Sequence, residues 1–124
     1  DSIPLHLLTD EALGVYERAL APGGILLIHT SNRFMTLEPV IAANARKRGL
    51  AALIRKDAPD MDRYFTPSNW IALSRSPVVL TTLAGRTPTL RWDSLGQPAA
   101  SGWTDDYASI LPYVRWRNLL GVAQ

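Results

Sequence analysis

Apolar and polar positions along the chain follow a helical period in some segments and form unbroken apolar runs in others. Thr9 is a good N-cap, and Asp10 and Glu11 follow it in a first turn, where carboxylates are favoured. Apolar residues then recur at helical spacing at Ala12, Leu13, Tyr16, Ala19 and Leu20. These positions predict a helix that ends before the turn formed by Pro22, Gly23 and Gly24.

The segment after this turn, residues 24–30, is almost entirely apolar. Such a run is expected of a strand buried on both faces of a parallel sheet. Residues 50–55 and 69–75 are predicted to form two further strands, with Trp70 and Ala72 on one face of the second. A helix, a turn and a buried strand together indicate an αβ unit.

Two more helices fit the pattern. Thr36 is predicted to cap the first, Pro39 is tolerated in its first turn, and Gly49 ends it. Its inner stripe consists of Leu37, Val40, Ile41 and either Asn44 or Ala45. The other helix starts at Ser76 and Pro77 and runs to about residue 84, and a brief strand is expected at residues 90–92.

The predicted order, α-β-α-β-β-α, places the chain in the α/β class with only about three main strands. A sheet this small leaves an edge that needs cover, either from strands outside this sequence or from a second copy of the chain. The first residue is Asp1 rather than Met, and the simplest interpretation is that residues 1–124 form a partial domain of a longer protein.

Composition narrows the function classes. With 124 residues, 47% hydrophobic and 19% charged, the chain can form one globular domain. A net charge of +2 with scattered Arg residues argues against a nucleic-acid surface. The basic cluster at residues 46–48 falls at a predicted helix end, where it interacts with the helix dipole; an anion or membrane contact is the alternative. The chain has no cysteine, which excludes disulfides and thiolate metal sites.

No cofactor motif is present. A dinucleotide site needs a Gly-rich turn between a strand and a helix, but Gly23 and Gly24 precede a strand. No cluster of acids and His has the spacing of metal ligands. His6 and His29 lie far apart in sequence, and a lone His is more often structural than catalytic. Ser31 lacks the G-x-S-x-G context of a nucleophile elbow.

Three polar segments remain as candidates for chemistry: residues 1–7, 29–33 and 103–107. In the last, Asp105 and Asp106 lie between aromatic residues, a combination that suits an amine because the carboxylate pairs with the ammonium and the rings hold the methylenes. The alternative is a helix start capped by Thr104 or Asp105. Residues 29–33 follow a strand, where α/β sheets bind ligands; alternatively they only organise the turn.

Four segments resemble the C-terminal half of spermidine synthase-like proteins, which have the class I methyltransferase fold. They are DSIPLHLLTDEAL (1–13), LAPGGILLIHTSNRF (20–34), LEPV (37–40) and WTDDYASIL (103–111). The resemblance implies the C-terminal half of a Rossmann-like fold, with the last main strand antiparallel and the nucleotide-binding half upstream. The variant is similar to members fused to membrane transporter-like segments, so the implied location is the cytoplasm, with or without such an anchor.

The family carries two acids, D-x-x-D, on a gate loop. The resemblance implies that Asp1 is the second of these, a catalytic position, and that the first lies upstream. It implies substrate contacts from the strand-end and tail segments and the lead-in: His6, Ser31, Asn32, Asp105, Asp106 and Tyr107. After Asp1 the family has P-x-G-P-A, whereas this chain has Ser-Ile-Pro-Leu-His, a departure that bears on polyamine specificity.

The function implied is aminopropyl or methyl transfer to a small-molecule amine. The donor would be S-adenosylmethionine or its decarboxylated form, bound by the missing N-terminal half. The 124 residues alone would then hold no cofactor and be inactive. The alternative is a non-catalytic module derived from a methyltransferase fold and retained for packing or homo-oligomerisation, which four Trp residues would suit.

Overall fold

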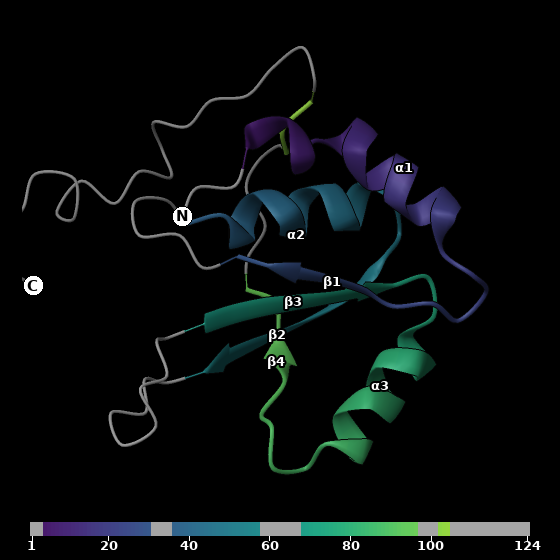
Figure 1. The fold of residues 1–124 in the computed structure, drawn as a ribbon, viewed down its shortest axis with the longest axis vertical. Helices are drawn as coiled ribbons and strands as arrows, with labels where there is room; N and C mark the ends of the chain where they lie inside the picture. Colours follow the sequence, from purple (N-terminus) through teal and green to yellow (C-terminus); the bar gives the residue numbers. More distant parts are fainter. Residues whose placement is uncertain (1–3, 31–35, 58–67, 97–101, 105–124) are drawn as a thin grey trace, which may run out of the picture.

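The computed structural model describes residues 4–30, 36–57, 68–96 and 102–104. They form a mixed α/β arrangement of three α-helices, a short 3-10 helix and a four-stranded sheet, which confirms the α/β class (Figure 1). In chain order the elements are η1 (Leu5–Leu7), α1 (Asp10–Ala19), β1 (Leu26–His29), α2 (Glu38–Lys47), β2 (Ala51–Asp57), β3 (Ser68–Ser74), α3 (Pro77–Arg86) and β4 (Asp93–Ser94).

The sheet has the strand order β1-β3-β2-β4, and each neighbouring pair is antiparallel. The prediction of a parallel sheet is therefore wrong for the described strands. β1 and β2 are connected through α2 and run in the same direction, but they are not neighbours in the sheet. β3 lies between them in the opposite direction, as expected for the last main strand, so that His29, Trp70 and Arg55 form one cross-strand row.

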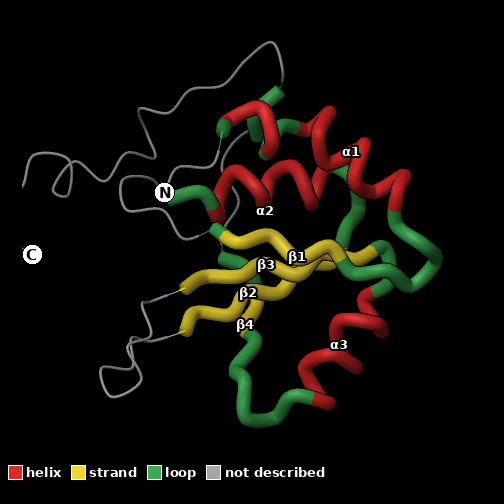
Figure 2. Tube along the Cα trace, viewed as in Figure 1, coloured by secondary structure: helices red, strands yellow, loops and turns green. Residues whose placement is uncertain are grey.

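The elements pack in three layers, with α1 and α2 on one face of the sheet and α3 on the other (Figures 1 and 2). The main core lies between the sheet and the first two helices. Its buried members are Leu8, Leu13, Leu37, Val40, Ile41, Ala45, Leu50, Ile54, Ile71, Leu73 and Trp103. The predicted inner stripe of α2 is confirmed, because all of its positions are buried.

The predicted helix ends at Thr9, Gly49 and Ser76 are confirmed, and the one at Thr36 is wrong. The Thr9 hydroxyl accepts a hydrogen bond from the Ala12 amide at 3.2 Å, as an N-cap should. Gly49 ends α2 with φ = 69°, a left-handed conformation that favours glycine. Thr36, however, does not cap α2: the N-cap is Leu37, which has no side-chain cap hydrogen bond. Leu37 is fully buried, so packing fixes this helix start.

β1 was expected to be buried on both faces, and this is wrong. Its side chains alternate, and Leu27 is 54% exposed while Ile28 packs against the core. The reason is the place of β1 at the edge of the sheet. On the face away from α1 and α2, α3 packs against β2 and β3. The exposed face of β1 is therefore a property of tertiary position that the apolar run does not reveal.

Four residues fix α2 against α1 and the segment that leads into α1, and we call them the helix buttress: Asp10, Asn44, Lys47 and Arg48. Asp10 receives hydrogen bonds from Lys47 Nζ at 3.1 Å and from Arg48 Nε at 2.8 Å. Burial alone would raise the pKa of Asp10, but the Lys47 hydrogen bond and the charges of Arg48 and Lys47 outweigh it and lower that pKa. The basic cluster is thus at a helix end, as predicted, with an acid as partner.

Candidate functional site

Of the residues predicted to form the site, only His6 is described. It lies in η1 and is exposed. The others lie outside the described residues: Asp1, Ser31, Asn32, Asp105, Asp106 and Tyr107. Their predicted roles stay predictions.

The described ends of two predicted site segments do meet. Asn44, which is 2% exposed, donates from Nδ2 to the carbonyl oxygens of Leu8 and Trp103, each at 3.1 Å. The Asp10 amide donates to the same Trp103 carbonyl at 2.7 Å. The lead-in that contains His6 and the segment at Trp103 therefore lie side by side over α2, although about 95 residues separate them in sequence.

His29 ends β1 and is exposed. Its ring lies against Trp70 of β3, with a centroid distance of 4.7 Å and an interplanar angle of 40°. The adjacent Thr30 is buried, and its amide donates to the Asn69 carbonyl at 2.8 Å. These contacts fit the structural interpretation of His29, because an aromatic cross-strand pair stabilises the end of the β1–β3 ladder.

A pocket of about 580 Å³ opens where α2 begins, near the carboxyl end of β2. We call it the strand-end pocket. Its lining comes from the start of α2, two strands and the chain around β4: Thr36, Glu38, Pro39, Ile54, Lys56, Asn69, Asp93, Ser94, Leu95 and Gly96. In sheets with helices on both faces, ligands commonly bind outside the carboxyl ends of same-direction strands. The pocket is in that position.

Glu38 is the most unusual member of this lining. Its Oε1 accepts a hydrogen bond from Asn69 Nδ2 at 3.1 Å. Its Oε2 is buried and has no hydrogen-bond partner. Glu38 is also the first residue of α2, where the helix dipole favours a negative charge. A buried carboxylate oxygen without a donor is costly to the folded state.

The sheet side of the pocket is set by strand register. Lys56 of β2 is directly opposite Asn69 of β3, and both project to the α2 face of the sheet with Ile54. Lys56 is exposed, and Asp93 is exposed and paired with Arg91 at 3.3 Å. The pocket lining therefore has one half-buried carboxylate with a single buried, unpaired oxygen, and two charges that water can screen.

Sequence reasoning missed this pocket. The local pattern around Glu38 indicates only a helix start, and that around Asn69 only the start of a strand. The single available signal was the Leu-Glu-Pro-Val run, which contributed to the family resemblance but suggested no role for its acid. Residues 38, 56, 69 and 93 come together only through the strand order.

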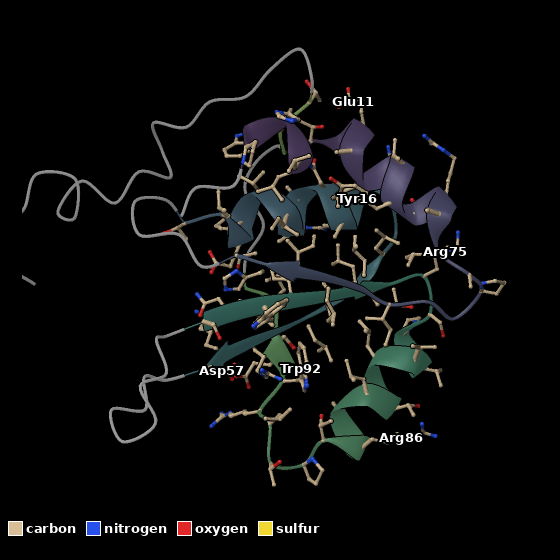
Figure 3. All side chains as sticks on the ribbon, in the orientation of Figure 1. Glu11, Tyr16, Asp57, Arg75, Arg86 and Trp92 are labelled. Atoms are coloured by element: carbon tan, nitrogen blue, oxygen red, sulfur yellow. The ribbon has the colours of Figure 1, made fainter. Side chains whose placement is uncertain are left out.

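The opposite face of the sheet carries a second polar group near the same end (Figure 3). Arg55 Nη2 donates to Asp57 Oδ2 at 2.7 Å, and Ser68 donates to the same oxygen at 3.1 Å. The Arg55 hydrogen bond is the main cause that lowers the pKa of Asp57, although burial opposes it. The Arg55 guanidinium also lies 5.6 Å from the centre of the Trp92 ring. The charge of Arg55 therefore already has an ion-pair partner, Asp57, and an aromatic neighbour, Trp92, within this chain.

Comparisons with known proteins returned no match: no family model, no curated protein and no solved structure is similar to this chain. Within the described residues, no three His, Asp or Glu side chains gather closely enough to hold a metal ion. None of the helices in the described part of the chain is long and apolar enough to cross a membrane.

Proposed function

We propose that this chain is the acceptor-side half of a spermidine synthase-like transferase, which moves an aminopropyl or methyl group from an S-adenosylmethionine-type donor to an amine. The observation that carries the proposal is the edge position of β1. This strand has the apolar composition of a fully buried strand, yet it lies at the end of the sheet order with Leu27 54% exposed. Further strands beside β1 would cover its edge, and the helices packed on those strands would bury its exposed face, as a Rossmann-like sheet requires.

The chemistry needs a neutral, nucleophilic amine directed at a carbon bonded to a sulfonium. The nitrogen lone pair forms the new C–N bond, the C–S bond breaks with its electrons going to sulfur, and the amine loses a proton. Carboxylates would orient the amine and accept that proton. In this proposal the predicted Asp1, Asp105 and Asp106 supply the acids. The support is that Leu8 and Trp103, which belong to the same two segments of the chain, both accept hydrogen bonds from Asn44.

The donor site belongs, in this proposal, to the strands that extend the sheet beyond β1. The 124 residues contain no Gly-rich turn between a strand and a helix that could hold the nucleotide. Isothermal titration calorimetry of the isolated chain with S-adenosylmethionine should therefore show no binding. Tight binding would contradict the proposal that the donor site lies outside these 124 residues. In the longer protein, a strand with a Gly-rich turn and an intact D-x-x-D motif should precede Asp1; their absence would also count against it.

A second candidate function is a non-catalytic assembly module. The same edge of β1 favours it, because an exposed strand edge can pair with another copy. Light scattering separates the two functions. A stable dimer of the isolated chain that disappears in Leu27→Lys would support the module, whereas a monomer over a wide concentration range would count against it.

A further inference from the structure

One buried side chain, Asn44, holds two segments that are far apart in sequence. Its Nδ2 donates to the carbonyl oxygen of Leu8 in the lead-in, residues 5–9, and to that of Trp103 in residues 102–104, each at 3.1 Å. Because Asn44 is 2% exposed, the loss of either acceptor leaves a buried amide hydrogen without a partner, which is costly. The position of each segment therefore bears on the stability of the other.

The Trp103 carbonyl joins the two segments a second time. It also accepts a hydrogen bond from the Asp10 amide at 2.7 Å, so one oxygen receives donors from the start of α1 and from α2. The side chains of Leu8 and Trp103 are both buried in the same core cluster. Opening one segment alone would thus leave polar atoms unpaired and uncover part of the core under the other.

Gly102 shows how closely residues 102–104 approach α2. A Cβ at Gly102 would overlap the side-chain amide of Asn44, whereas a Cβ at Gly96, which also lies near α2, would meet no atom within 4 Å. The backbone therefore reaches Asn44 only because residue 102 has no side chain. Any shift of Asn44 that a larger residue there forces is felt at Leu8, its other partner.

We propose that the lead-in and residues 102–104 form one latch over α2, which opens and closes as a unit while the sheet and α3 stay folded, and that Asn44 couples its two halves. Local opening in such cooperative units, below the free energy of global unfolding, is common in proteins. The coupling is reciprocal, so whatever displaces residues 102–104 releases the lead-in, and the reverse. The latch does not depend on the proposed function.

Native-state hydrogen exchange of the full 124-residue chain in increasing urea tests whether the two halves open together. The reporters are the Ala12 amide, which is bonded to the Thr9 hydroxyl of the lead-in, and the indole N–H of the buried Trp103. Both should show one opening free energy and one urea dependence, each smaller than those of the Ile71 amide in β3. Different values for the two reporters, or values equal to those of Ile71, would overturn the latch.

Gly102→Ala tests the coupling from one side. The added methyl group displaces Asn44 and should speed exchange of the Ala12 amide, in the other half of the latch, at least about tenfold. The matched control is Gly96→Ala, in which the methyl group meets nothing, and Ala12 exchange should stay within about twofold of the original rate. Unchanged Ala12 exchange in a folded Gly102→Ala chain would show that the two halves are independent.

Tyr16→Phe tests the coupling from the other side and decides it if Gly102→Ala does not fold. It removes the 3.0 Å hydrogen bond from Tyr16 Oη to the Leu7 carbonyl and should speed exchange of the Trp103 indole at least about threefold. Leu80→Val, in α3, should instead speed exchange of Ile71 and leave the latch reporters unchanged. An unchanged Trp103 rate in Tyr16→Phe, or latch reporters that respond to Leu80→Val, would overturn the proposal.

Discussion

Asp10 and Glu38 each occupy the first turn of a helix that packs over the sheet, yet their surroundings differ. In the helix buttress, both oxygens of Asp10 receive donors, from Lys47 and from Arg48, and the two helices are joined as a result. In the strand-end pocket, Glu38 has one amide donor and one buried oxygen without a partner. The dipole contribution is similar at both positions.

The difference separates two uses of a carboxylate. An acid whose oxygens are both paired within the chain contributes to stability and offers nothing to a ligand. An acid that keeps one buried oxygen without a donor bears a cost that no described residue offsets. Mutation in the helix buttress should therefore lower the free energy of unfolding, and mutation of Glu38 should change it much less.

The largest expected effect is in the helix buttress at Asn44. Asn44→Ala removes the donor to the buried carbonyl groups of Leu8 and Trp103 and should lower the free energy of unfolding by about 2–4 kcal/mol. Urea unfolding followed by circular dichroism measures this. Thr81→Ala, on the exposed side of α3, is the control and should change stability by less than about 0.5 kcal/mol. A comparable loss in both variants would contradict the stabilising role of the Asn44 hydrogen bonds.

Asp10→Asn should destabilise the chain by about 1–2 kcal/mol at pH 7, because it breaks a partly buried charge pair with Arg48. The pKa of Asp10 is lower in the folded state than its ordinary value of 3.8, so its stabilising contribution is present above that value and is lost as pH falls through the folded pKa.

Chemical unfolding between pH 7 and pH 2.5 tests the direction in which the free energy of unfolding changes with pH. The original chain should lose stability below about pH 5, and Asp10→Asn should lose less over the same interval. Asp57 also has a lowered pKa, so some acid sensitivity will remain in the variant and should fall further in Asp10→Asn combined with Asp57→Asn. Identical pH profiles for the original chain and Asp10→Asn would contradict the role of Asp10.

Glu38→Gln should leave the free energy of unfolding within about 1 kcal/mol of the original value. Loss of the helix-dipole interaction lowers stability, while removal of a charge from a buried, half-paired oxygen offsets that loss. Thermal unfolding without ligand measures the sum. A large destabilisation, comparable to that of Asn44→Ala, would mean that Glu38 belongs with the structural carboxylates, and the comparison with Asp10 would fail.

The smallest effect is expected at the sheet edge. Leu27 is 54% exposed, so Leu27→Thr should change the stability of the isolated chain by less than about 0.5 kcal/mol. In the longer protein that we propose, the same change should cost about 1–2 kcal/mol, because the added strands and the helices packed on them would bury the side chain. Equal, small effects in both contexts would mean that nothing covers β1.

Much of the fold could be predicted from local pattern. Thr9 predicts the start of α1, the stripe containing Val40 and Ile41 predicts the inner face of α2, and Gly49 predicts the end of α2. Each of these depends on residues within one or two turns of helix. The cap at Thr36 failed because burial of Leu37 fixed the start of α2 instead.

The candidate site was much harder to predict from the sequence than the fold. The predicted residues were chosen as polar segments after strands, and only His6 among them is described. Glu38 and Asn69 were not chosen, because each has an ordinary local explanation as a helix start and a strand start. Their hydrogen bond joins residues 31 positions apart and depends on β3 lying between β1 and β2.

By itself, the sequence determined the three α-helices, the three main strands and the apolar faces of α1 and α2, since these follow from short-range periodicity and caps; the brief strand expected at residues 90–92 instead forms at Asp93–Ser94. The tertiary structure alone decided the order of the strands, the exposure of Leu27 and the half-satisfied carboxylate of Glu38. The physical reason is range. Periodicity fixes which side of an element is apolar, but strand order and helix docking decide what lies against that side, and therefore which polar atoms keep a partner.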